Sequence, residues 1–292
     1  MDIKKRNRFL NLGNYSRSVV TNLDVLAKKK AKTTSLSNDL EYKNVETTAR
    51  DYFDIGLRHL LSYHHEIALI YFHRCLDQSP DCALVYGLIA LCHCPNYNFK
   101  GDAYYDYPDS YNFPSQKLGE QYSRLAMEKI EELKTLHSPN ICFNGHGTRK
   151  REEHKTKPIN NVEVGIITAI RKLTCKPGIL SIEAERHVGR PYACALQLVY
   201  QQYPNDLDVA YWYAESLMVL NAWKLYNYPH GNIISTDVTE IEKTLDASLI
   251  ISSNHAENSS FHMGLCHLYV HLCEMSSKPQ RALKVCSILR NE

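Results

Sequence analysis

The stretch YFDIGLRHLLSYHHEIALIYFHRCLDQSP constrains the fold more than any other part of the sequence. In a repeat frame of about 34 residues, Tyr52, Gly56, Ala68, Phe72 and Pro80 fall where a helix–turn–helix repeat places large, small, small, aromatic and Pro residues. The two small residues let two helices cross closely, and the aromatic residues fill the space beside the crossing. The proline ends the second helix. This stretch therefore predicts one helical hairpin.

The same helical period recurs along most of the chain. We expect long loops around residues 94–115, 138–160 and 223–235, and about four helical pairs in total. Stacked pairs bury a shared core through nearest neighbours, so at least three are needed for stability. The fold class that we predict is all-α, a helical-hairpin superhelix (α-solenoid) with long loop insertions. The first helical hairpin that we expect spans residues 45–77, and the helices that we expect after it span residues 81–92, 116–134, 162–174, 192–202, 208–220, 239–251, 261–274 and 279–290.

The N-terminal residues 1–45 differ in composition from the rest. Basic clusters at residues 4–8 and 28–32 stand among Ser, Thr and Asn, which is typical of a disordered, solvated tail. A nuclear address or an organelle presequence are the alternatives, and the acidic residues Asp2 and Asp24 count against a presequence. We assign residues 46–292 to the helical repeat domain. No polar capping helix follows the last pair, so we expect a chain that is incomplete at its C-terminus.

Composition restricts the compartment and the partner class. The chain has ten cysteines and no signal-peptide stretch, which favours a reducing compartment and free thiols. No apolar run reaches the roughly 18 residues of a membrane-spanning helix, and a net charge of +2 gives no reason to expect nucleic acid. We predict a cytoplasmic protein, or a nuclear one if the basic clusters act as an address, with no membrane and no nucleic-acid partner.

Several motifs resemble a subfamily of tetratricopeptide-repeat (TPR) proteins found in bacteria and eukaryotes. They are Cys-Pro-Asn-Tyr-Asn at residues 94–98, Tyr-Pro-Asn-Asp-Leu-Asp at 203–208 with Tyr-Ala-Glu-Ser at 213–216, and Gly-Leu-Cys-His-Leu-Tyr-Val-His at 264–271. The resemblance covers roughly residues 50–290, with the motifs in family order. It implies a helical-repeat fold and a binding role. It implies no reaction, so no catalytic residue is carried over.

The histidines of the last pair raise the question of a metal site. His267 and His271 stand one helical turn apart, and Glu274 follows on the same face as a possible third ligand. The His-Glu-x-x-His pattern is absent because Leu268 follows His267, and no Cys-x-x-Cys spacing occurs. Buried thiols and packing histidines are the more common arrangement. We therefore predict no metal and no other cofactor.

Motifs of the common catalytic loops are missing from the sequence. No G-x-S-x-G, Walker-type or G-x-G-x-x-G sequence is present, so acyl transfer and nucleotide binding lack their usual loops. We predict that the chain is not an enzyme and name no catalytic residue.

The segment from Tyr97 to Phe113 is dense in aromatic residues and has two interpretations. It is either a cover packed over the inner face of the helices or a recognition surface, since Tyr is enriched in binding hot spots. Some repeat proteins of this class grip a terminal carboxylate with polar residues on their first helices. The corresponding positions here, Phe53, Leu57 and Leu88, are apolar and disfavour that clamp.

These observations predict a non-catalytic scaffold that binds a protein or peptide in the groove formed by the first helices of the pairs. The alternative is a metal- or small-ligand-binding protein, or an unrecognised enzyme, that uses the histidines of the last pair with the loop at residues 95–98. The partner's identity and the oligomeric state do not follow from the sequence. The predicted partner-binding residues are Phe53, Leu57, Asn96, Tyr97, Asn98, Tyr213, His267 and His271.

Overall fold

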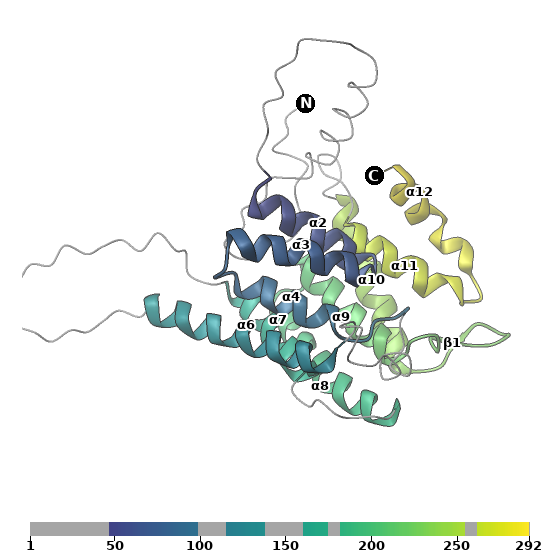
Figure 1. Cartoon of the computed structure of the whole chain (residues 1–292). Coiled ribbons are helices and arrows are strands. Elements are labelled where there is room, and N and C mark those ends of the chain that lie inside the picture. The colour runs from purple at the N-terminus through teal and green to yellow at the C-terminus, as the bar shows by residue number, and fades with distance from the viewer. Residues whose placement is uncertain (1–46, 99–114, 138–159, 175–181, 255–261, 292) are drawn as a thin grey trace, which may run out of the picture.

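The computed structural model describes residues 47–98, 115–137, 160–174, 182–254 and 262–291 (Figure 1). These residues form ten α-helices, one 3₁₀ helix and one two-stranded antiparallel hairpin, so the protein is all-α. The predicted tail at residues 1–45, most of the aromatic segment and most of the insertion at residues 138–160 lie outside the described residues. The elements are α2 (Ala49–Leu61), α3 (His65–Gln78), α4 (Ala83–Cys92), α6 (Gln116–His137), α7 (Asn161–Thr174), α8 (Ile182–Gln202), α9 (Leu207–Leu220), β1 (Tyr226–Asn227), β2 (Asn232–Ile233), α10 (Thr236–Asn254), α11 (Met263–Glu274), η3 (Pro279–Ala282) and α12 (Leu283–Asn291).

The first helical pair forms as the sequence predicts. Thr48 caps α2 reciprocally with Asp51, since the Thr48 hydroxyl accepts from the Asp51 backbone N–H and the Thr48 N–H donates to the Asp51 carboxylate at 2.9 Å. A Cβ atom at Gly56 would lie 2.8 Å from the Phe72 ring, so this position requires glycine for the helices to cross. Ala68 and Phe72 are fully buried at that crossing. The small and aromatic positions of the pattern therefore have the packing role that was predicted.

Five helical pairs, not about four, are present in the described part of the chain. Helix α2 packs on α3, α4 on α6, α7 on α8, α9 on α10, and α11 on α12. Successive pairs join through α3 and α4, α6 and α7, α8 and α9, and α10 and α11. The predicted start of α8 at Tyr192 was wrong, because the helix begins at Ile182 and continues through Pro191.

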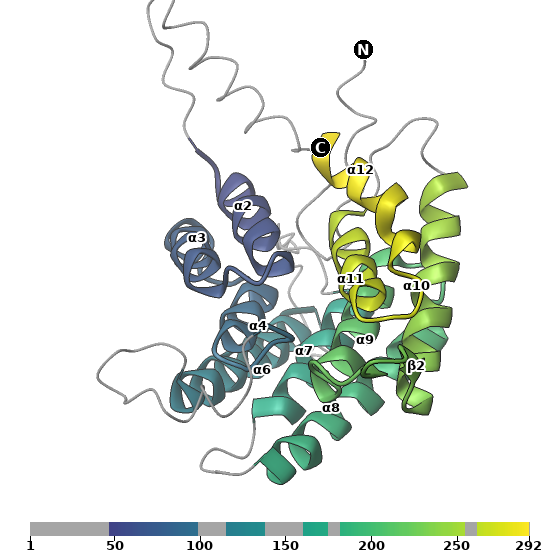
Figure 2. The same cartoon turned by 90° about the vertical axis from the view of Figure 1, so that its right-hand side faces the viewer.

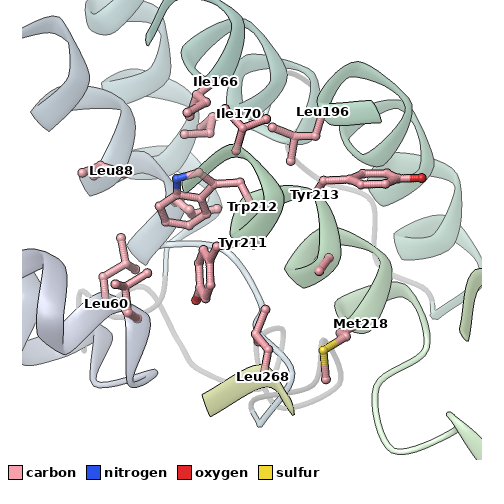
Figure 3. Close-up of a cluster of buried hydrophobic side chains, with 14 of the residues drawn as sticks. Leu60, Leu88, Ile166, Ile170, Leu196, Tyr211, Trp212, Tyr213, Met218 and Leu268 are labelled. Atoms are coloured by element: carbon pink, nitrogen blue, oxygen red, sulfur yellow. The ribbon is translucent and has the colours of Figure 1, made fainter. Parts of the chain in front are cut away.

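The core lies where the first helices of the pairs meet. Helix α4 touches α7, α7 touches α9, and α9 touches α11. Every residue of α9 from Asp208 to Met218 is buried, so this helix is surrounded on all sides. Figure 3 shows Tyr211 and Trp212 of α9 facing Leu60 and Leu88 from the first two pairs. Helix α9 is therefore the centre of the molecule.

The last helical pair contacts the first. Helix α11 contacts α2 as well as α9 and α10, so the two ends of the helical array meet (Figures 1 and 2). Stacking between neighbours alone would leave one face of α2 and one face of α11 open to solvent. Contact between them buries both faces and places residues from opposite ends of the sequence side by side.

A buried hydrogen bond fixes the start of α11 against the start of α9. His262 is the N-cap of α11, and its Nδ1 atom accepts a hydrogen bond from the Leu265 backbone N–H at 3.2 Å. This leaves the Nε2–H to donate to the Asp208 carboxylate at 2.9 Å. The two side chains are 1% and 7% exposed. One neutral histidine thus satisfies a helix cap and a carboxylate at once.

The region predicted as a loop at residues 223–235 contains a short β-hairpin. Tyr226 pairs with Ile233 and Asn227 with Asn232. The turn ends at Gly231, whose φ of +67° belongs to the left-handed region, and a Cβ there would lie 2.3 Å from the Ser277 backbone nitrogen. Only glycine fits both constraints. The turn is thereby fixed against the segment between α11 and η3.

Candidate functional site: the junction of the first and last helical pairs

Most of the predicted partner-binding residues lie inside the molecule. Phe53, Leu57, Tyr97 and Tyr213 are each at most 2% exposed, and Asn96 is 5% exposed. In this conformation their side chains contact the chain's own core instead of solvent. Three predicted residues keep some access to solvent: Asn98 is exposed, and His267 and His271 are partly buried.

The faces of the first helices that were expected to line an inner groove therefore pack against the chain's own core. The physical reason is the contact of α11 with α2, together with the full burial of α9. Apolar residues on the first helices have each other as partners, so they gain their burial energy without a ligand. The partner-binding role of the eight residues stays a prediction.

His267 and His271 form a continuous chain of polar contacts between the two ends of the array. His267 Nδ1 lies 2.8 Å from the backbone oxygen of Leu61, at the end of α2. The two Nε2 atoms lie 3.1 Å apart, and His271 Nδ1 lies 2.8 Å from Glu274 Oε1. Burial lowers the pKa of His267, while the hydrogen bond to Leu61 opposes this. The chain of contacts joins residues 206 positions apart in sequence.

Aromatic rings surround this pair of histidines. The Tyr63 ring lies 5.1 Å from the ring of His267 and 5.9 Å from that of His271, between centroids. The Tyr97 ring lies 4.8 Å from His271 and also stacks on Trp223 at 5.4 Å. Tyr63 has a φ of +60°, which is uncommon for a residue with a side chain and reflects the tight turn between α2 and α3. The junction is thus built from the first turn, the loop after α4, and α11.

A second buried histidine supports the same loop. His65 Nδ1 lies 3.2 Å from the backbone oxygen of Cys92, and its Nε2 lies 3.4 Å from the Asn96 side-chain nitrogen. Asn96 Oδ1 in turn accepts from the Asn98 backbone N–H at 2.9 Å. Burial lowers the pKa of His65 to about 4, so the ring is neutral at physiological pH. The Pro-Asn motif therefore has a structural role in holding Tyr97 in place.

Glu215 lies in the interior, at the middle of α9. It is 5% exposed, and its Oε2 atom has no hydrogen-bond partner among the described residues. Burial raises the pKa of Glu215 from 4.5 to about 8. Burial also raises the pKa of Tyr63, Tyr192 and Tyr211, and the Glu215 charge contributes to each shift. The carboxyl group is thus uncharged in the folded protein at neutral pH.

The β1–β2 hairpin carries much of the exposed apolar surface. In the described residues, eight large hydrophobic side chains are exposed, and four of them belong to residues 223–235. They are Trp223 (41%), Tyr228 (95%), Ile233 (42%) and Ile234 (49%). The segment's only charged side chain apart from His230 is that of Lys224. A concentration of this kind is typical of an interaction site, whereas single exposed hydrophobic residues are ordinary.

In the part of the chain that the structure describes, no group of three or more His, Cys, Asp or Glu side chains is arranged to hold a metal ion. Glu274 contacts His271 Nδ1 and does not join the two Nε2 atoms as a third ligand. No helix in the described segments is long and apolar enough to span a bilayer.

Comparison of the chain with protein-family models, curated proteins and solved structures finds no match. The resemblance to tetratricopeptide-repeat proteins therefore stays a prediction that rests on the motifs.

Sequence reasoning missed two features of the site. Glu215 stands between apolar residues in the middle of α9, and that contrast is the available signal for a buried carboxyl group. The exposed hairpin was treated as a loop, although its Tyr and Ile residues on either side of Pro229 and Gly231 are typical of a short hairpin. Its exposure could not be deduced, because a local pattern does not say which face meets solvent.

Proposed function

We propose that the protein is a non-catalytic, protein-binding scaffold of tetratricopeptide-type helical pairs, and that its contact surface is the hairpin at residues 223–235. The observation that carries the proposal is the clustering of four exposed large hydrophobic side chains on this one segment. Large aromatic and aliphatic side chains provide most of the binding energy in protein interfaces.

The repeat frame supports the tetratricopeptide assignment. Gly56 and Ala68 stand at the closest approach of α2 and α3, as that repeat requires, and five pairs succeed one another in the described residues. Helix α11 contacts α2, and most of the residues that were expected to line an inner groove are buried. A partner would therefore bind the outer side of the array.

The hairpin is held firmly enough to act as a binding surface. Tyr226 and Leu225 are buried beneath it, and its turn packs on the backbone of Ser277. A pre-organised surface loses little conformational entropy on binding. With Lys224 beside the apolar side chains, the surface fits a partner that combines apolar and acidic residues.

Replacing Tyr228 and Ile234 by Ser should weaken partner binding without unfolding the protein. Both side chains are exposed, so their loss removes interface area and leaves the core unchanged. We expect the affinity for the partner to fall by at least about tenfold, since hot-spot residues each contribute 2 kcal/mol or more. The measurement is affinity capture from an extract of the source cells, followed by a binding assay with the partner that is recovered.

The matched control replaces Leu198 and Ile250 by Ser. These side chains are 62% and 61% exposed on α8 and α10, so the control removes similar apolar surface away from the hairpin. The proposal requires a partner that the wild type and the control retain and the hairpin variant loses. If both double variants capture the same proteins as the wild type, the hairpin is not the contact surface.

A further inference from the structure

The two histidines of α11 face each other through their Nε2 atoms at 3.1 Å. The opposite nitrogen of each ring is already engaged: His267 Nδ1 with the Leu61 carbonyl oxygen, and His271 Nδ1 with the Glu274 carboxylate, both at 2.8 Å. A helix places residues four apart on one face, so this arrangement follows from the spacing along α11. The contact with Leu61 depends on the closure of the array.

The outer contacts determine where the ring hydrogens are. A backbone carbonyl and an ionised carboxylate can only accept hydrogen bonds. His267 and His271 must therefore both carry a hydrogen on Nδ1. In a neutral imidazole the other nitrogen then has a lone pair, so two acceptor nitrogens lie 3.1 Å apart. Two such lone pairs repel unless a cation lies between them.

The hydrogen bonds of the two Nδ1 atoms are also of the kind that metal-binding histidines make. A histidine ligand almost always donates its second ring N–H to a carboxylate or a backbone carbonyl, and the pair shows one example of each. Two nitrogens that each bind one ion at about 2.0–2.1 Å in tetrahedral geometry lie about 3.3–3.4 Å apart, so a small movement of the two rings from 3.1 Å would admit the ion. We propose that His267 Nε2 and His271 Nε2 together bind one divalent transition-metal ion.

The site supplies two protein ligands, so water or an added ligand would complete the coordination of the metal. Imidazole nitrogens favour Ni²⁺, Cu²⁺ and Zn²⁺ over Mg²⁺ or Ca²⁺. The rings of Tyr63 and Tyr97 lie against the two histidines. The His271 side chain is 12% exposed, which gives a metal ion access to the site. Because His267 is anchored to Leu61, metal binding would also hold α11 against α2 and stabilise the closed array.

The test is calorimetric titration of the untagged, full-length protein with Ni²⁺. A Cys194→Ser background removes a thiol that is exposed and could bind the metal itself. We expect one Ni²⁺ ion per chain, a higher melting temperature with Ni²⁺, and an affinity at least about tenfold lower in His271→Gln. The matched control, His230→Gln, replaces an exposed histidine on the hairpin and should bind like the background protein.

A second measurement does not depend on any variant. In the background protein labelled with ¹⁵N-histidine, Zn²⁺ should shift the Nε2 resonances of two histidines and leave their Nδ1–H resonances in place. The proposal is overturned if Ni²⁺ binds equally well to His271→Gln and to the background. It is also overturned if neither metal perturbs the two Nε2 resonances, in which case a shared proton is the cation between the rings.

Discussion

Replacing Glu215 by Gln should stabilise the protein increasingly as the pH rises, by up to about 4 kcal/mol at pH 7.5. In the wild type, burial raises the pKa of Glu215 from 4.5 to about 8. Each pH unit between these two values is worth about 1.4 kcal/mol. Gln has nearly the same shape and cannot ionise, so it removes this pH-dependent cost.

The sign follows from proton counting. Between pH 4.5 and about 8 the folded wild type holds a proton on Glu215 that the unfolded chain has lost. The free energy of unfolding of the wild type therefore contains a contribution from this group that is fully present below pH 4.5 and is lost as the pH rises. Other titrating groups are common to both proteins and cancel in the difference.

Urea unfolding at several pH values between 4.5 and 8 measures this difference. Any free-energy cost of packing the Gln amide in the core is independent of pH, so it adds a constant to the difference in the free energy of unfolding. Glu131→Gln is the control, because Glu131 is 65% exposed and its replacement should leave the pH profile unchanged. A difference between Glu215→Gln and wild type that does not vary with pH would show that Glu215 ionises normally in the folded state.

Replacing His262 by Ala should lower the free energy of unfolding by about 3–5 kcal/mol. The substitution removes the cap of α11 and leaves the Asp208 carboxylate, 7% exposed, without its 2.9 Å partner. A buried polar group without a partner bears its full desolvation cost, which exceeds the net value of the bond that is lost. The loss should be read from urea unfolding at neutral pH.

Two further variants separate the causes of that loss. His262→Asn keeps a good N-cap residue and should recover about 1 kcal/mol. His262→Ala combined with Asp208→Ala removes the stranded carboxylate and should be more stable than His262→Ala alone. His230→Ala, on the exposed hairpin, should change stability by less than about 0.5 kcal/mol. A loss below about 1 kcal/mol in His262→Ala would contradict a buried, well-formed contact.

The helices were largely predictable because their signals are local. The turns at Pro80 and Pro204 and the apolar period of α7 depend on residues within one or two helical turns, and the crossing of Gly56 with Phe72 joins two helices that are adjacent in the chain. The predicted start of α8 was wrong because the rule that proline interrupts a helix is overridden at Pro191, which lies within α8. The number of pairs was underestimated because the loops between helices obscure the period.

The candidate site was predictable in part only. His267 and His271 were identified together because their spacing along one helix brings them together. The contact of His267 with Leu61 was not predicted, because it joins residues 206 positions apart in the sequence. Phe53, Leu57 and Tyr213 were assigned to a binding groove since an open array would expose them.

The sequence by itself determined which segments are helical and how neighbours pair, since those choices depend on side chains close along the chain. Only the tertiary structure decided that α11 meets α2. Closure depends on the small rotation between each pair and the next, summed over five pairs, and no residue pattern encodes that sum. The same closure buries the predicted groove and brings His267 to Leu61. Four of the eight exposed large hydrophobic side chains of the described residues lie on the segment at residues 223–235.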